Sequence, residues 1–162
     1  MKKILLLLIL AFGFGQYTFT SEDLNPSSPT YAENIGPESY PGVVTLYYFG
    51  YQYWGTCASR FESLNQLYSE NSSDSFQFEI IGVGKSSYAS YNDNFTNDTD
   101  LPFVMDESPG HEIWSDWSVN QRDLVFLDKN GDFYCKINLS SGFNAADILN
   151  KIHHIHWNTT AN

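Results

Sequence analysis

Residues 43–68 read VVTLYYFGYQYWGTCASRFESLNQLY, and this stretch decides the fold. Its first seven residues are β-branched, aromatic or leucine and lie between Gly42 and Gly50, which is typical of a strand buried on both faces. After a short loop, residues recur at the helical positions i, i+4, i+7 and i+11, namely Cys57, Phe61, Leu64 and Tyr68. The stretch therefore predicts a strand, a loop and a helix with one buried stripe.

The thiol of Cys57 lies in the first turn of this predicted helix. Unpaired backbone N–H groups and the positive end of the helix dipole favour thiolate over thiol at such a position. The loop-to-helix junction is therefore a geometry typical of redox sites, and Cys57 is the candidate reactive cysteine.

The N-terminus predicts export. Residues 1–15 combine two lysines, an apolar run from Ile4 to Phe12 and two small residues, Gly13 and Gly15, which are the three parts of a secretory signal peptide. The apolar run is shorter than the about 20 residues that a transmembrane helix needs. We expect a secreted or extracytoplasmic protein. Its chain divides into a signal peptide (1–15), an irregular proline-containing lead-in (16–42), one domain (43–156) and a short tail (157–162).

The charge restricts the partners. The sequence carries a net charge of −11, and removal of Lys2 and Lys3 with the signal peptide lowers it to −13. An acidic surface repels nucleic acid and anionic membranes, so neither is an expected partner. Five Asn-X-Ser/Thr sequons would accept glycans in a eukaryotic secretory pathway. They begin at Asn71, Asn94, Asn97, Asn138 and Asn158.

The chain beyond the first helix predicts further strands. Residues 76–83 and 101–105 form two of them, separated by a polar, tyrosine-containing segment (84–100) that we expect to be a loop with one helical turn. A strand, a helix and a strand make a βαβ unit with a right-handed crossover. Residues 124–127 and 133–139 are strands joined by an Asn-Gly turn, the strongest short hairpin signal.

The C-terminal segment predicts an amphipathic helix that begins at an Asn144 cap and ends near Ile155. His153 and His156 share a face near its end. No acidic or cysteine ligand stands close to them in the sequence, so no metal site is expected.

The two cysteines, Cys57 and Cys135, leave two alternatives open. In an oxidising compartment they could form a structural disulfide. Alternatively, Cys135 alternates with Phe133 and Ile137 on the inner face of a strand and is a free, buried thiol that packs as a small hydrophobe. The alternation favours the free thiol.

The order strand, helix, strand, polar segment, strand, aromatic helix, hairpin, helix resembles the thioredoxin fold, a three-layer α/β sandwich around a central mixed sheet. More narrowly, residues 43–155 resemble the N-terminal domain of selenoprotein P. The shared features are a strand leading into a motif that ends in Cys57, Leu101-Pro102 before an acidic stretch and Trp114, and Gln121-Arg122-Asp123 before Leu-Val-Phe-Leu-Asp. The Sec- and His-rich tail and the basic heparin-binding character of that family are missing, so selenium transport is not implied.

The resemblance concerns above all the motif Trp54-Gly55-Thr56-Cys57. In the thioredoxin class the first position carries the nucleophile, a cysteine or selenocysteine, and the last carries the resolving thiol one turn deeper. Here Cys57 takes the resolving position. The nucleophile's position holds Trp54, whose indole has no lone pair available for attack.

Three interpretations of residue 54 are open. In the first, which the resemblance favours, Trp54 stands for a UGA codon that encodes selenocysteine. The protein then performs thiol/selenol–disulfide exchange or thiol-dependent peroxide reduction. Its partners are a thiol reductant and a disulfide or peroxide, and no cofactor is implied beyond this selenium. In the second, a true Trp makes a redox-inactive extracellular binding domain that presents Tyr51, Tyr53 and Trp54 to a protein partner. In the third, Cys57 acts alone through sulfenic acid or mixed disulfides.

Thr56, Arg122 and Asp123 are the candidate substrate-contacting residues. Thioredoxins place a cis-proline on the strand that faces the motif, and the matching position here is Asp123 or its neighbour Arg122. Arg122 would stabilise a nearby thiolate or selenolate, and Asp123 would oppose it. Alternatively, the two side chains pair with each other or with solvent. The missing proline argues against binding of an extended peptide in the thioredoxin manner.

Overall fold

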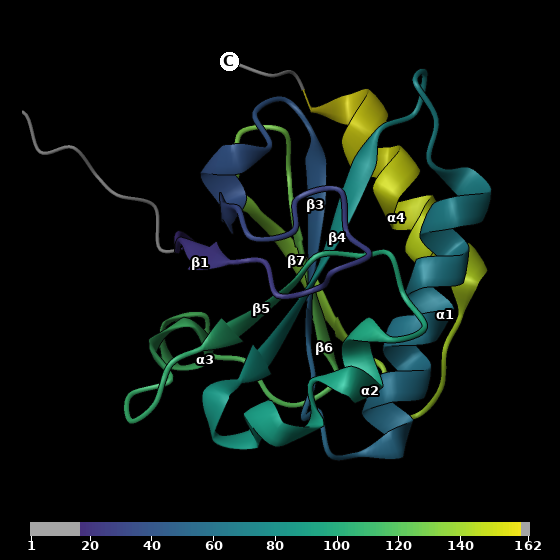
Figure 1. The fold of residues 1–162 in the computed structure, drawn as a ribbon. Helices are drawn as coiled ribbons and strands as arrows, with labels where there is room; N and C mark the ends of the chain where they lie inside the picture. The colour runs from purple at the N-terminus through teal and green to yellow at the C-terminus, as the bar shows by residue number, and fades with distance from the viewer. Residues whose placement is uncertain (1–16, 160–162) are drawn as a thin grey trace, which may run out of the picture.

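The computed structural model describes residues 17–159 and has a five-stranded mixed sheet at its centre (Figure 1). The strand order is β5-β4-β3-β6-β7. β4 runs parallel to β3 and β5, whereas β6 runs antiparallel to β3 and β7. The strands are β3 (Val44–Phe49), β4 (Phe78–Lys85), β5 (Phe103–Asp106), β6 (Asp123–Leu127) and β7 (Phe133–Asn138). The predicted signal peptide, residues 1–15, lies outside the described residues.

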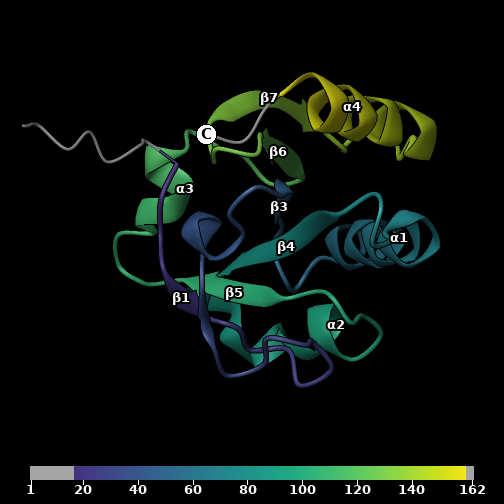
Figure 2. The same ribbon diagram turned by 90° about the horizontal axis from the view of Figure 1, so that it is seen from above.

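Helices cover the sheet on both sides and complete the predicted three layers (Figure 2). The helices α1 (Gly55–Asn71), α2 (Asp93–Thr96) and α4 (Ala145–Asn158) lie on one face, and α3 (Glu112–Asp116) lies on the other, where Tyr17 and Phe19 also pack. Successive residues of a strand point to opposite faces. Tyr48 therefore packs with α1 and α4, and Tyr47 packs with Trp114 and Trp117. Because both faces of β3 are covered, the strand is apolar along nearly its whole length.

The predicted elements are confirmed with small shifts. The βαβ unit is β3-α1-β4, and the Asn-Gly turn joins β6 and β7 as a hairpin. Asn144 caps α4, since its side chain accepts a hydrogen bond from the backbone N–H of Asp147 at 3.1 Å. The segment 84–100 holds two short helices, η2 (Ser86–Tyr91) and α2, rather than a loop with one turn.

The lead-in is more ordered than the sequence suggests. It forms a two-stranded antiparallel sheet of β1 (Ser21–Glu22) and β2 (Asn34–Ile35), followed by the 3-10 helix η1 (Pro37–Ser39). Its Asp23 and Asn25 side chains are buried. The Asp23 carboxylate accepts a hydrogen bond from the backbone N–H of Phe103 at 2.9 Å, and Asn25 Nδ2 donates to the carbonyls of Thr99 and Leu101, each at 2.8 Å. These bonds make the lead-in part of the domain.

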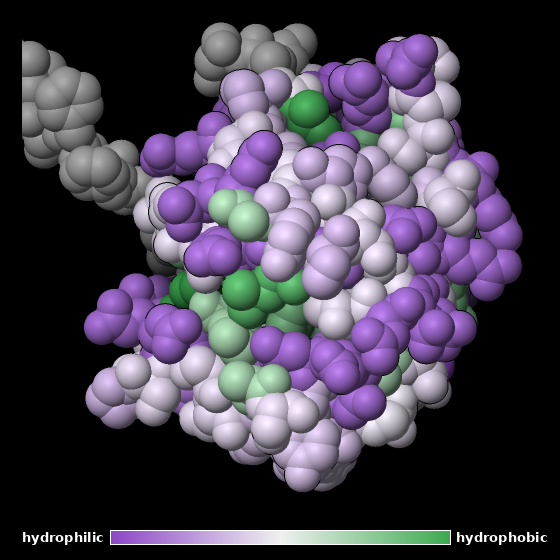
Figure 3. Space-filling model, viewed as in Figure 1, coloured by the Kyte–Doolittle hydropathy of each residue, from purple (hydrophilic) through white to green (hydrophobic). Residues whose placement is uncertain are grey.

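One face of the molecule is shown in Figure 3. Most of the side chains on this face are hydrophilic or intermediate in hydropathy, and apolar ones are visible mainly near its centre, with others near the top. Among residues 17–159, no helix combines the length and the apolar character needed to cross a bilayer.

Candidate functional site

Residues 54 and 57 lie where β3 passes into α1. Trp54 is the N-cap residue of the helix, and its carbonyl accepts hydrogen bonds from the backbone N–H groups of Cys57 at 2.8 Å and Ala58 at 3.2 Å. The Trp54 side chain is 40% exposed, whereas Cys57 is 0% exposed. The prediction of an exposed residue at the start of the helix and a thiol one turn deeper is confirmed. A hydrogen-bonded turn brings the Cα atoms of positions i and i+3 within about 7 Å, and a disulfide spans about 4.4–6.8 Å.

Cys57 is enclosed by the core and held by two polar neighbours. The Tyr48 hydroxyl donates to the Cys57 carbonyl at 3.2 Å, and Cys57 Sγ lies 4.0 Å from Oε1 of Gln121. Burial and the neighbouring thiol raise the pKa of Tyr48, so this hydroxyl stays protonated and available as a donor. A buried thiol is out of reach of an external disulfide or peroxide. The geometry therefore opposes chemistry at Cys57 alone and suits a resolving thiol.

Arg122 is brought to the motif. Its backbone lies in the left-handed region, with φ 68°, between the end of β3 and the end of β7. The Arg122 N–H donates to the Phe49 carbonyl at 2.6 Å, and the Arg122 carbonyl accepts from Leu139 N–H at 2.8 Å. Its guanidinium lies over the Trp54 indole, 5.5 Å from the ring centroid, and Nε donates to Ser140 Oγ at 2.9 Å. A positive charge thus stands beside the side chain of residue 54.

Asp123 is directed away from the motif. It is 4% exposed and accepts hydrogen bonds from the backbone N–H of Asn120 and from Asn138 Nδ2, both at 2.8 Å. Lys136 Nζ lies 3.4 Å from the same carboxylate. Asp123 alternates with Val125, which faces the α3 side of the sheet, whereas Cys57 faces the other side. The Arg122–Asp123 ion pair considered from the sequence is not formed. Asp123 instead stabilises the fold through its hydrogen bonds to Asn120 and Asn138.

The remaining candidate, Thr56, is exposed in the first turn of α1. It therefore shares the outer side of the motif with Trp54. Of the three candidate substrate-contacting residues, Thr56 belongs to the motif, Arg122 is brought to it by the fold, and Asp123 faces the opposite side of the sheet.

The disulfide alternative is wrong, because Cys57 and Cys135 are both free thiols. Cys57 packs beneath the start of α1, whereas Cys135 lies on the edge strand β7, opposite Phe126 and near Lys151 of α4. The expectation that Cys135 is a buried thiol is met only in part. It is half-buried because β7 is at the edge of the sheet, and this burial raises the pKa of its thiol.

A continuous aromatic surface, here called the tyrosine surface, surrounds the exposed motif residue. It consists of Tyr51, Tyr53, Trp54, Tyr88 and Tyr91. Tyr53 is central: its ring centroid lies 4.7 Å from that of Tyr88, 5.7 Å from that of Trp54 and 6.2 Å from that of Tyr91. Sequence reasoning found the first three residues but not Tyr88 and Tyr91. Their only signal was the tyrosine content of segment 84–100.

Sequence reasoning also missed Gln121 as the polar neighbour of the thiol. Its position directly before Arg122 was the available signal, because a residue beside one that reaches the motif is close to it as well. In the part of the chain that the structure describes, no three His, Cys, Asp or Glu side chains converge as metal ligands.

Comparison with known proteins identifies the fold. No protein-family model and no curated protein matches the sequence. The thioredoxin domain of a thiol-disulfide oxidoreductase from Bacteroides vulgatus matches with a TM-score of 0.66 at 16% identity, over 89% of this chain and 96% of that one. A secreted Mycobacterium tuberculosis disulfide oxidoreductase matches with a TM-score of 0.62 at 16% identity, over 85% and 96%.

A further match is the mitochondrial 2-Cys peroxiredoxin of Plasmodium falciparum, with a TM-score of 0.65 at 20% identity over 86% of this chain and 90% of that one. These likenesses, together with the mixed sheet and its helices, establish a thioredoxin-like fold.

Proposed function

We propose that the protein is a secreted thioredoxin-like redox protein that uses position 54 as its nucleophile and Cys57 as its resolving thiol. One observation carries the proposal: an exposed N-cap position, a free buried thiol one turn deeper and a guanidinium over the exposed side chain occur together. The helix N-terminus and Arg122 both favour an anion at this position. An indole can attract the guanidinium through its ring face, but it carries no negative charge for the helix N-terminus to stabilise.

The chemistry requires sulfur or selenium at position 54. In disulfide exchange, the chalcogenolate of residue 54 attacks one sulfur of a substrate disulfide and displaces the other as a thiolate. Cys57 then attacks residue 54, releases the second substrate thiolate and leaves a bond between residues 54 and 57. In peroxide reduction, attack on ROOH gives ROH and an oxidised residue 54, and condensation with Cys57 releases water. Two equivalents of an external thiol restore the reduced pair in either case.

Selenocysteine is the residue that we propose for position 54. The resemblance to the N-terminal domain of selenoprotein P supports this assignment, and some genetic codes render UGA as Trp. Export through residues 1–15 is part of the same proposal. Four of the five sequons begin at exposed asparagines, namely Asn94, Asn97, Asn138 and Asn158. Nδ2 of Asn138, the atom that a glycan would modify, already donates hydrogen bonds to Asp123 and Gln121, so Asn94, Asn97 and Asn158 are the better acceptors.

The identity of residue 54 is tested by mass spectrometry of the protein from its source. Selenium has a distinctive isotope pattern, so a peptide that spans residues 54–57 distinguishes selenocysteine from Trp. We expect the selenium pattern. A mass that corresponds to Trp would refute the selenocysteine assignment and leave the second candidate function below.

The activity is tested with a Trp54→Cys variant in reductant-dependent reduction of hydrogen peroxide and of insulin disulfides. We expect activity in this variant and none in the matched Trp54→Ser variant. The double variant Trp54→Cys/Cys57→Ser should accumulate mixed disulfides without turnover. An inactive Trp54→Cys variant that is folded, with the three thiols at positions 54, 57 and 135 all titratable after denaturation, would overturn the redox proposal.

The tyrosine surface supports a second candidate, a redox-inactive extracellular binding domain. Tyrosine and tryptophan are enriched at the energetic centres of protein interfaces. Here Tyr53, Trp54 and Tyr91 are exposed together. Under this function Trp54→Ala weakens capture of a protein partner from extracellular fluid by tenfold or more, and the exposed Tyr31→Ala variant, outside the surface, leaves it unchanged. Equal capture by both variants would exclude it.

A further inference from the structure

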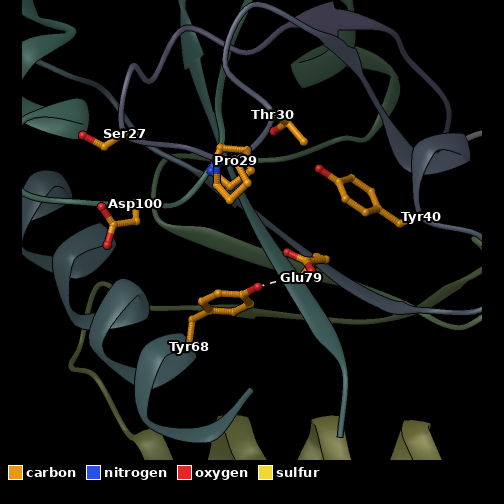
Figure 4. A pocket seen from close by; sticks show the side chains of 8 residues that line it. Ser27, Pro29, Thr30, Tyr40, Tyr68, Glu79 and Asp100 are labelled. Atoms are coloured by element: carbon orange, nitrogen blue, oxygen red, sulfur yellow. Dashed lines mark hydrogen bonds between the residues drawn. The ribbon is translucent and has the colours of Figure 1, made fainter. Parts of the chain in front are cut away.

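A cavity of about 380 Å³ lies far from the motif. Thr45 and Glu79 pair near the starts of β3 and β4, whereas Trp54 follows the end of β3. The cavity is bounded by the lead-in, the last turns of α1, the start of β4 and the segment before β5. Its lining residues are Ser27, Pro29, Thr30, Tyr40, Tyr68, Glu79, Asp100 and Pro102. Figure 4 shows these side chains around the common space.

Three polar groups are turned toward this space (Figure 4). The Tyr68 hydroxyl lies 3.3 Å from Oε1 of Glu79 and hydrogen-bonds to it. The Tyr40 hydroxyl is buried and lies near the Thr30 side chain, but among the described residues it makes no hydrogen bond of ordinary geometry. A buried polar atom without a partner costs free energy that a bound ligand recovers.

Glu79 has no cationic partner in the described chain. The salt bridges among residues 17–159 join Lys136 to Asp123 and Lys151 to Asp147. Burial raises the pKa of Glu79, and the hydrogen bond from Tyr68 opposes this rise. A partly buried carboxylate without a counter-ion, beside a second acidic residue, Asp100, creates a negative potential in the cavity.

The lining selects the charge and the shape of a ligand. None of the described residues that line the cavity is Lys, Arg or His, so an anion finds no countercharge there. The carboxylate of Glu79 and the Tyr40 hydroxyl can accept hydrogen bonds from a cation. The rings of Tyr40 and Tyr68 and the two prolines offer apolar walls, and aromatic faces attract cations. The volume is at the lower end of the range for small-molecule sites, about 300–1,000 Å³.

We propose that this cavity binds an organic ammonium ion, a primary amine on a small apolar body, with Glu79 as its counter-ion and Tyr40 as a hydrogen-bond partner. The amine is either a free small molecule or a lysine side chain of a peptide. The proposal is independent of the chemistry at residue 54, because the two sites share no residue. The negative charge of the chain favours cations at long range as well.

Titration followed by NMR tests the proposal. The probes are 2-phenylethylamine, its neutral analogue 2-phenylethanol, and the lysine peptide N-acetyl-Gly-Lys-Gly-amide. We expect the amine to shift the signals of Tyr40, Tyr68 and the Glu79 backbone, and to bind at least tenfold more tightly than the alcohol. Tighter binding of the peptide than of the free amine assigns the source to a polypeptide, and the reverse assigns it to a small molecule.

Two variants make the test specific. Glu79→Gln keeps the size of the side chain and its acceptor for Tyr68 but removes the charge, so amine affinity should fall about tenfold. Glu62→Gln, at an exposed position on α1, is the matched control and should bind as the wild type does. Tyr40→Phe should weaken binding about threefold without altering the fold. Equal affinity for amine and alcohol, an unchanged affinity in a folded Glu79→Gln variant, or no shift at 20 mM amine would overturn the proposal.

Discussion

Replacing Asp123 with alanine is expected to destabilise the fold while leaving the chemistry of the motif in place. The carboxylate accepts two hydrogen bonds at 2.8 Å and lies 3.4 Å from Lys136. A hydrogen bond to a charged group contributes about 1.5–3 kcal/mol. Lys136 is partly exposed, so its ion pair adds less than about 1 kcal/mol. The free energy of unfolding should therefore fall by about 3–6 kcal/mol, which lowers the Tm by roughly 6–24 °C for a domain of this size.

Urea denaturation followed by circular dichroism measures this change. Asp123→Asn keeps one oxygen acceptor and should lose about half as much stability as Asp123→Ala. Asp98→Ala, at an exposed position, is the control and should stay within about 0.5 kcal/mol of the wild type. In the Trp54→Cys background, Asp123→Asn should retain peroxide reduction. A loss below 1 kcal/mol in Asp123→Ala, or loss of activity in a folded Asp123→Asn variant, would refute the structural assignment.

Three further predictions concern titratable groups. In the Trp54→Cys background, Arg122→Met should raise the pKa of the introduced thiol by about 0.5–1. The reason is that a charge 5.5 Å from the replaced ring contributes about 0.8–1.5 kcal/mol in a mostly aqueous setting. The pH dependence of iodoacetamide alkylation measures this pKa, and an unchanged value would contradict the prediction. Burial raises the pKa of Glu79, so the folded chain binds more protons than the unfolded chain between the two pKa values, and stability falls as the pH rises through that window. Glu79→Gln should therefore raise the Tm at pH 7, with the difference disappearing near pH 4; a lower Tm at pH 7 counts against this reasoning. Because burial raises the pKa of the Cys135 thiol, a Cys57→Ala variant should react with iodoacetamide at pH 7 more slowly than free cysteine does, and an equal rate would show that the thiol is not perturbed.

The central elements are predictable from sequence because their information is local. The apolar run of β3, the helical spacing in α1 and the Asn-Gly turn each fix one element within a few residues. The lead-in is different. Asp23 and Asn25 look like loop residues, and their burial depends on backbone groups of residues 99–103 that are distant in the sequence. Hydrophobic periodicity and turn motifs describe only neighbouring residues, so they cannot predict hydrogen bonds between segments this far apart in the sequence.

The candidate site divides in the same way. The relation of Trp54 to Cys57 follows from their spacing at a helix start, so the sequence predicts it. The position of Arg122 over Trp54 depends on a left-handed backbone conformation at a non-glycine residue. No pattern in the sequence predicts this conformation. The direction of Asp123 was open to deduction, because strand alternation places it with Val125 on the face opposite Cys57. The acidic cavity combines distant elements and was not foreseeable.

The lead-in also governs how this sheet meets other chains. Leu24 N–H donates to the Phe103 carbonyl at 2.8 Å, and Ser21 Oγ donates to the Met105 carbonyl at 3.1 Å, so the outer side of β5 is occupied. The opposite border, β7, carries the exposed Phe133 and Tyr134. Unpaired strand borders template association and aggregation. A strand from another molecule would therefore add to β7. Proteolytic removal of the segment that includes Ser21 and Leu24 would expose a second unpaired edge, on β5, where association could also begin.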